Sequence, residues 1–152
     1  SEFCGQSRGT DPPGNPGYNT VWFQYWSAVS DYLATQPLYR TRAYYHIVNE
    51  PQTFEHYDIV AYLAHMTKSA APNVRLMLSE QVEPAIHSHP SFPNAKIDIW
   101  LPTISNYQVE RAHERQLHHN EQVWWYFLYG DRPPLPNPTI INWPTFCSRL
   151  MP

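Results

Sequence analysis

The sequence predicts an α/β protein with parallel β-strands, and three observations lead to this fold class. Short runs of β-branched and aromatic residues alternate with helical segments along the chain. The connections between these runs are helices or long crossovers, which join parallel strands. The clearest strand, residues 43–49, is apolar or aromatic on both faces apart from His46, as expected where a parallel sheet is covered on both sides.

The chain divides into a short first segment and one domain. Residues 1–19 are predicted to be irregular, because residues 9–19 are rich in glycine, proline, aspartate and asparagine. Residues 20–152 contain all the predicted elements and no internal repeat. The first helix is expected after Thr20, a suitable N-cap, and Pro37 ends it.

The later elements follow the same alternation. A second helix is expected after Thr53, another suitable cap, and it ends before Pro72. The remaining elements are strand 74–81, a loop over 82–95 with room for one helical turn, strand 96–102, helix 106–120, strand 121–130 and a short helix over 143–151. Four strands cannot close a parallel barrel, which needs eight. The residues therefore predict either a small open sheet or about half of a barrel.

Composition and charge exclude several classes of function. The formal net charge is −3 and the only lysines are Lys68 and Lys96, so no basic patch suggests a nucleic acid or an anionic membrane as partner. No apolar run approaches the roughly 20 residues that span a bilayer. Five glycines leave little material for a phosphate-binding loop. Cys4 and Cys147 are compatible with one disulfide or with two unrelated thiols.

The eight histidines do not predict a metal site. Two clusters have spacings that occur in metal proteins, His87 with His89 and His113 with His118 and His119. Apart from Glu114, no cysteine or carboxylate lies beside them at a ligand-like spacing. We expect these histidines to be solvated and expect neither a metal nor another cofactor.

Polar residues at the ends of two strands are the candidate catalytic groups. Asn49 and Glu50 end one strand before Pro51, and Glu80 and Gln81 end the next. Ligands of parallel α/β folds bind beyond the carboxyl ends of the strands, where the loops converge. A partly buried carboxyl there has a raised pKa and can protonate the oxygen that leaves a glycosidic bond. The alternative is an ordinary strand end followed by a turn.

Aromatic residues near the other strand ends could form the walls of such a site. Trp100 lies at the end of the third strand, and Trp125 and Tyr126 lie in the fourth. Together with Gln81 and Glu80 they are expected to bind a sugar, with Asn49 positioning the substrate beside Glu50. The competing interpretation places these aromatic residues in the hydrophobic core.

The chain from about residue 21 onward resembles the C-terminal part of the family-123 glycoside hydrolases and the related domain of unknown function 4091. The segments that carry the resemblance are "YLATQPLYRTRAYYHIVNEPQTFEHY", "IDIWLPTISNY", "QVWWYFLYG" and "NPTIINWPTFCSRL". The resemblance implies a TIM-type (β/α)8 barrel, of which residues 20–152 supply about strands four to seven. The carbohydrate-degrading relatives imply an extracellular or periplasmic protein. The rest of the barrel would come from another segment or chain.

The resemblance also implies a mechanism. In that family an Asp-Glu pair ends strand four; the Glu is the general acid/base, and the Asp holds the 2-acetamido group of the sugar, which attacks the anomeric carbon. Here Glu50 matches the Glu and Asn49 stands where the family has Asp. A neutral amide forms a weaker hydrogen bond than a carboxylate does. The alternative function is therefore a non-catalytic carbohydrate-binding or structural barrel fragment.

Overall fold

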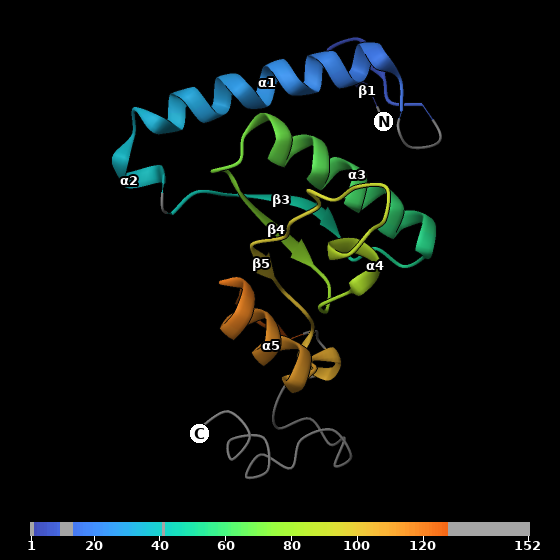
Figure 1. Ribbon diagram of the computed structural model, residues 1–152, viewed down its shortest axis with the longest axis vertical. Coiled ribbons are helices and arrows are strands. Elements are labelled where there is room, and N and C mark those ends of the chain that lie inside the picture. Colours follow the sequence, from blue (N-terminus) through green and yellow to red (C-terminus); the bar gives the residue numbers. More distant parts are fainter. Residues whose placement is uncertain (1, 10–13, 41, 128–152) are drawn as a thin grey trace.

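The computed structural model describes residues 2–9, 14–40 and 42–127. Figure 1 shows α1 and α3 side by side at one end of the molecule and α5 at the other, with the sheet between them. The elements are β1 (Glu2–Phe3), β2 (Gln6–Ser7), α1 (Pro16–Ala34), α2 (Pro37–Arg40), β3 (Tyr44–Asn49), α3 (Phe54–Ala70), β4 (Arg75–Ser79), α4 (Pro84–His87), β5 (Ile99–Trp100), the 3-10 helix η1 (Ile104–Asn106), α5 (Val109–His119) and β6 (Gln122–Val123).

The main sheet has four parallel strands in the order β3-β4-β5-β6, which confirms the predicted α/β class. Each connection runs through at least one helix, as parallel pairing requires. The strands are shorter than predicted, but their pairing continues. Beyond β5 and β6, Thr103 forms a bridge with Tyr126, and the Tyr126 N–H donates to the Pro102 carbonyl over 3.1 Å. The last residues of the predicted fourth strand, 128–130, lie outside the described part of the chain.

The first segment is more regular than the prediction of an irregular stretch over residues 1–19, which is wrong where the structure describes it. β1 and β2 form an antiparallel hairpin whose turn residues, Cys4 and Gly5, both have positive φ, as a tight two-residue hairpin turn requires. α1 begins at Pro16, because the side chain of Asn15 accepts the N–H of Gly17 and caps it. Cys147 is outside the described residues, so the choice between a disulfide with Cys4 and two unrelated thiols stays open.

The cap predicted at Thr53 and the helical turn predicted within residues 82–95 agree with the structure, whereas the predicted helix 106–120 is shorter, as α5 (Val109–His119). Thr53 caps α3 by accepting the N–H of His56 over 3.2 Å. The single helical turn within residues 82–95 is α4, whose cap is the side chain of Glu83. α5 ends at Asn120, whose φ of 52° is the left-handed conformation typical of a C-terminal cap. The predicted helix over 143–151 lies outside the described residues.

One face of the sheet carries the hydrophobic core. Tyr45, on this face of β3, contacts Trp26 of α1 with ring centroids 4.7 Å apart. α3 covers the same face with six buried residues. The other core residues of these strands are Ile47, Leu76, Leu78, Trp100 and Val123. Burying this surface contributes about 25 cal/mol per Å² of apolar area, so the packing of α1 and α3 on this face stabilises the fold.

The opposite face of β3 is open, so the prediction that this strand is buried on both faces is wrong. The register pairs Tyr44 with Arg75 and His46 with Met77, which places these residues on the second face. Tyr44 and His46 are exposed there, because the helices that border β3 pack on its other side. The alternation of exposed and covered residues along β3 is typical of a half-buried strand.

The second face of the sheet is concave. Strands lie about 4.8 Å apart, so a flat sheet would place β3 and β6 about 14 Å from each other. Tyr44 of β3 and Trp124, which follows β6, nevertheless make an edge-to-face contact with centroids 5.9 Å apart. Arg75 reaches across β5 in the same way and donates to the Gln122 side chain over 2.8 Å. These contacts link β3 and β4 to the segment around β6 across the concave face.

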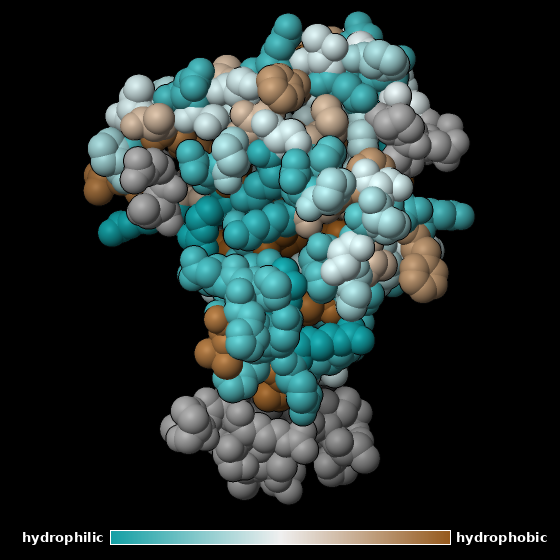
Figure 2. Space-filling model, viewed as in Figure 1, coloured by the Kyte–Doolittle hydropathy of each residue, from teal (hydrophilic) through white to brown (hydrophobic). Residues whose placement is uncertain are grey.

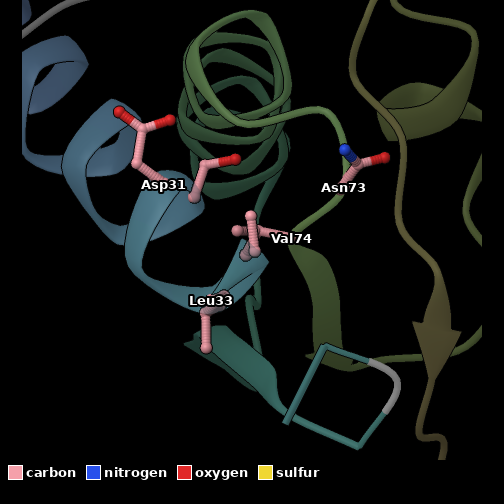
Figure 3. A pocket seen from close by; sticks show the side chains of 6 residues that line it. Asp31, Leu33, Asn73 and Val74 are labelled. Atoms are coloured by element: carbon pink, nitrogen blue, oxygen red, sulfur yellow. The ribbon is translucent and has the colours of Figure 1, made fainter. Parts of the chain in front are cut away.

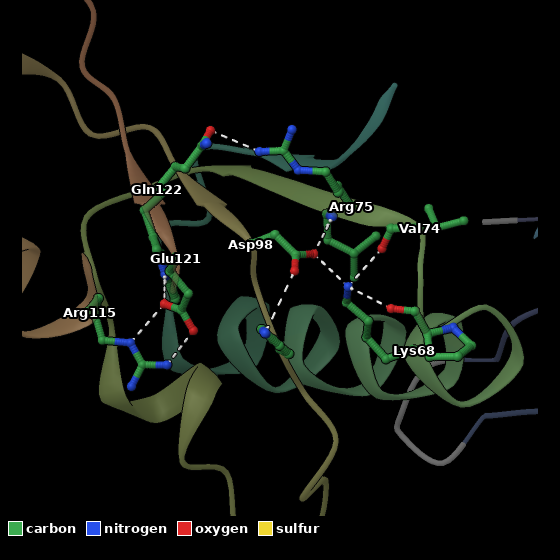
Figure 4. Close-up of polar contacts among 11 residues, drawn as sticks. Lys68, Val74, Arg75, Asp98, Arg115, Glu121 and Gln122 are labelled. Carbon is green, nitrogen blue, oxygen red and sulfur yellow. Dashed lines mark hydrogen bonds and ion pairs between the residues drawn. The ribbon is translucent and has the colours of Figure 1, made fainter. Parts of the chain in front are cut away.

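A partly buried ion pair and a buried one attach helices to the sheet (Figure 4). Lys68 of α3 donates to Asp98 Oδ2 over 2.5 Å, and the same oxygen accepts the N–H of Leu76 over 2.7 Å. Burial lowers the pKa of Lys68, and Asp98 opposes that shift. Arg115 of α5 binds both carboxylate oxygens of Glu121, so α5 is held against the strand that follows it.

The surface seen in Figure 2 is mostly hydrophilic, and apolar atoms are visible between the polar groups near the middle of the molecule. The described residues with large exposed apolar side chains include Tyr44, Trp124, Trp125 and Phe127, and of these Tyr44 and Trp124 contact each other on the concave face. No helix among the described residues is both long and apolar enough to cross a membrane.

Candidate functional site

A depression of about 200 Å³ opens where β3 and β4 end and where the Thr103–Tyr126 bridge extends the sheet. We call it the strand-end cleft, and it lies where ligands bind in parallel α/β folds. Its lining residues are Glu50, Gln52, Ser79, Glu80, Gln81, Thr103, Ser105, Asn106 and Tyr126. All of them are polar, and none is lysine or arginine.

Glu50 enters the cleft from an unusual backbone conformation. Its φ is 46°, in the left-handed region that costs an ordinary residue about 1–2 kcal/mol. Pro51 follows directly and is buried. The side-chain amide of Gln52 donates to the Glu50 carbonyl over 3.0 Å and closes the turn. Backbone strain of this kind is typical of functional sites, where the surrounding structure holds it in place.

Tyr126 connects the two outer strands through the carboxylate of Glu50. Its hydroxyl donates to Glu50 Oε1, although the two residues are 76 positions apart in the sequence. Burial raises the pKa of Tyr126, and the hydrogen bond to Glu50 raises it further. The phenol therefore stays protonated at neutral pH and acts as a hydrogen-bond donor. One oxygen of Glu50 is held by Tyr126, and the other takes part in no hydrogen bond among the described residues.

Glu80 is the second carboxyl group of the cleft. It follows β4, and its Oε1 accepts the N–H of Gln81 over 2.8 Å. Burial raises the pKa of Glu80; the hydrogen bond from Gln81 opposes the shift, while the charges of Glu83 and Glu50 add to it. Gln81 is itself held by the side-chain amide of Gln108. The cleft thus combines two carboxyl groups in different surroundings with the hydroxyls and amides that sugars bind.

The strain at Glu50 predicts a difference between two variants. Glycine adopts a positive φ without the steric cost that alanine meets, so Glu50→Gly should have a free energy of unfolding about 1 kcal/mol higher than Glu50→Ala. Both variants lack the carboxylate and its bond to Tyr126, so the comparison isolates the backbone. Urea unfolding measures the difference. A Glu50→Ala variant as stable as Glu50→Gly would contradict the left-handed conformation.

Four of the seven predicted site residues come together in the cleft: Glu50, Glu80, Gln81 and Tyr126. Asn49 is exposed and pairs in the sheet with Ser79, but it is not among the residues that line the cleft. Its predicted role beside Glu50 finds no support in this position.

The prediction that Trp100 binds a sugar is wrong. Its side chain is fully buried in the core, and its indole N–H donates to Glu121 Oε2 over 2.8 Å. The register pairs Trp100 with Leu78 and Val123, both on the helix-covered face of the sheet. Trp125 is 37% exposed and packs on Phe127 with ring centroids 5.1 Å apart, but it does not line the cleft.

Five residues that line the cleft were not predicted from the sequence. For three of them the sequence does contain an indication, their position after a strand. Thr103, Ser105 and Asn106 follow the third strand and Pro102, so the rule that drew attention to Glu50 applies to them too. Ser79 carries no such signal, because it lies inside the strand predicted over residues 74–81, although β4 itself ends at Ser79. Its hydroxyl is hydrogen-bonded to His46 Nε2 over 2.9 Å, a contact that depends on the pairing of β3 with β4.

Several of the described histidines have hydrogen-bond partners within the chain. His89 Nε2 lies 3.1 Å from Asp58 Oδ1, and His119 Nε2 lies 2.8 Å from Glu114 Oε1. Burial lowers the pKa of His87, and the nearby Arg115 lowers it further. Within the described ranges, no group of three or more histidine, cysteine, aspartate or glutamate residues could hold a metal ion.

A second depression, of about 220 Å³, lies between the end of α1 and the segment that leads into β4 (Figure 3). Asp31 comes from α1, and Asn73 and Val74 precede β4. This depression is at the amino end of β4, opposite the edge where ligands of such folds bind. Asp31 is its only carboxylate, so it offers less chemistry than the strand-end cleft.

Comparisons with protein-family models, with curated proteins and with solved structures found no match to this chain.

Proposed function

We propose that the chain is a glycoside-hydrolase-like domain that cleaves glycosidic bonds in the strand-end cleft, with Glu50 as the general acid/base. The observation that carries the proposal is the placement of Glu50. A costly left-handed backbone points its carboxylate into a polar cleft, where Tyr126 holds one oxygen. A residue that served only as a strand end would gain nothing from this strain.

The lining of the cleft supports a sugar as the substrate. Three side-chain amides and three aliphatic hydroxyls surround the two carboxyl groups and the phenol. A sugar ring presents many hydroxyl groups that both donate and accept hydrogen bonds, and these side chains can do the same. The resemblance to family 123 favours 2-acetamido sugars among the candidates.

The sheet geometry supports the proposal that these strands belong to a TIM-type barrel, as about its strands four to seven. The concave face and the contacts between β3 and β6 are what a sheet curving toward closure would produce. β3 and β6 are the outer strands of the described sheet. We propose that further strands, from another segment or chain, complete the barrel in an extracellular or periplasmic protein.

Replacing Glu50 with glutamine tests the activity. On a panel of aryl glycosides that includes N-acetylgalactosaminides and N-acetylglucosaminides, we expect Glu50→Gln to lower kcat/KM by about 10²–10⁴-fold, because the amide cannot exchange a proton. Ser105→Ala is the matched control, since it removes one lining hydroxyl and neither carboxyl group. Hydrolysis at the same rate by the native chain and Glu50→Gln would refute the proposal.

A second candidate function is carbohydrate binding without catalysis. The observation that favours it is the exposed pair Tyr44 and Trp124 on the concave face, because sugar rings stack on such side chains. The same panel distinguishes the two candidates when binding is measured in parallel. Sugar binding that survives Glu50→Gln, together with no hydrolysis by the native chain, would favour this candidate.

A further inference from the structure

The two carboxyl groups of the strand-end cleft differ in their hydrogen bonds. Glu50 accepts a hydrogen bond from the hydroxyl group of Tyr126 at Oε1, and Tyr126 comes from the segment after β6, the other outer strand of the sheet. Glu80 accepts only the backbone N–H of the next residue, Gln81, at Oε1. Its second oxygen, Oε2, takes part in no described hydrogen bond and is the atom that can carry a proton.

The charged and titratable groups around Glu80 favour its protonated form. Tyr57 reaches it from α3, Glu83 from the start of α4, Glu50 from the end of β3 and Tyr126 from the segment after β6. All four are acidic groups, so none offers a positive charge to an ionised Glu80. No lysine or arginine lines the cleft among the described residues. Half-burial of the side chain acts in the same direction.

We propose that Glu80 is the general acid of the reaction and that Glu50 is its base. The inference depends on the proposed glycosidase function and divides the work between the two carboxyl groups. It also gives a physical reason why Asn49 need not supply a second carboxylate, since Glu80 already provides one in the cleft.

The reaction then balances in one displacement. Glu80 gives its proton to the glycosidic oxygen as the bond between that oxygen and the anomeric carbon breaks, and the bonding electron pair stays on the oxygen. A water molecule adds its oxygen to the anomeric carbon, and Glu50 takes the proton that the water loses. Exchange with solvent afterwards removes the proton from Glu50 and restores the one on Glu80.

Substrates with different leaving groups test this division. A phenyl glycoside needs a proton on its leaving oxygen, whereas a dinitrophenyl glycoside departs as a stable anion. We expect Glu80→Gln to lower kcat/KM by about 10²–10⁴-fold on the phenyl glycoside but by less than about tenfold on the dinitrophenyl glycoside. Glu50→Gln should lower both by a similar factor, because water must be activated in either case.

The pH dependence of hydrolysis gives a second test of the role of Glu80, with Glu83→Gln as the matched control. The acid must carry its proton, so the activity of the native chain should fall as the pH rises through the raised pKa of Glu80. Glu83→Gln removes one of the negative charges that raise this pKa and should move the fall to lower pH. Glu80→Gln should abolish this limb of the profile on the dinitrophenyl substrate.

The results of these assays distinguish failure of the proposed glycosidase function from failure of the roles assigned to Glu80 and Glu50. If the native chain hydrolyses neither substrate, the proposed function fails, and the roles of the two carboxyl groups fail with it. If the native chain is active but Glu50→Gln spares the dinitrophenyl glycoside while Glu80→Gln does not, the function stands and the division of roles is overturned. Equal losses on both substrates for Glu80→Gln would overturn it as well.

Protein stability gives a readout that needs no substrate. A glutamate whose pKa is raised on folding binds more protons in the native state, so its contribution to stability is present at low pH and is lost as the pH rises through the folded pKa. Glu80→Gln should therefore lose less stability than the native chain over that range in urea titrations. An identical loss in both proteins would contradict a proton held on Glu80.

Discussion

Replacing Arg115 with methionine is expected to lower the free energy of unfolding by about 3–5 kcal/mol. Arg115 and Glu121 are both buried, and the guanidinium binds both oxygens of the carboxylate. Arg115→Met leaves Glu121 inside the protein without a counter-charge, with the indole N–H of Trp100 as its remaining described donor. Urea unfolding at neutral pH measures the loss.

A double variant is the control for this prediction. Arg115→Met combined with Glu121→Gln removes both charges and keeps an oxygen that accepts from Trp100. Neutralising a buried pair together costs much less than breaking it, so we expect the double variant to be clearly more stable than Arg115→Met alone. A cost below about 1 kcal/mol for Arg115→Met would show that the pair behaves as a solvated surface ion pair.

Replacing Trp100 with alanine is expected to destabilise the protein by a similar amount, about 3–5 kcal/mol. The side chain is fully buried, so its removal leaves a cavity. It also removes the hydrogen bond that the indole N–H donates to Glu121. Trp125→Ala is the matched control, because Trp125 is an exposed tryptophan close in sequence. There we expect a loss of about 1 kcal/mol or less, mainly from its contact with Phe127.

This pair of variants also tests the two interpretations of the aromatic residues. The sequence alone does not distinguish a core tryptophan from a sugar-binding one. Their replacement by alanine does, because losing a core tryptophan lowers the stability much more. If Trp100→Ala unfolded at the same urea concentration as the native chain, its burial in the core would be contradicted. The urea midpoint and slope, measured together, separate a change in stability from a change in the unfolded state.

Local sequence signals predicted the elements that depend on neighbouring residues. Thr53 caps α3 because the hydroxyl and the N–H that it accepts are three residues apart, so no distant contact is needed. Helices between successive strands likewise predict parallel pairing from connection length alone. The cap at Asn15 was missed because Thr20 offers the same chemistry four residues from Pro16. Thr20 instead donates to the Pro16 carbonyl inside α1.

In the candidate site, too, some features could be predicted from the sequence and others depend on the tertiary structure. Glu50 and Glu80 were predicted because both follow apolar strands, and parallel strands place their carboxyl ends at one edge. Their environments could not be predicted from the sequence, because burial and neighbouring charges depend on packing. The bond from Tyr126 to Glu50 joins residues on the two outer strands and forms only because the sheet is concave.

By itself the sequence determined the α/β class, the parallel order of strands and helices, and the presence of two carboxyl groups at strand ends. These properties follow from hydrophobic pattern and chain connectivity, which are local along the chain. Tertiary structure decided which face of each strand is buried, and so placed Trp100 in the core and left Tyr44 exposed. It also decided that Asn49 lies outside the cleft while Tyr126 lies inside it. The physical reason is that register and curvature arise from contacts between strands, and no single segment of the chain contains them.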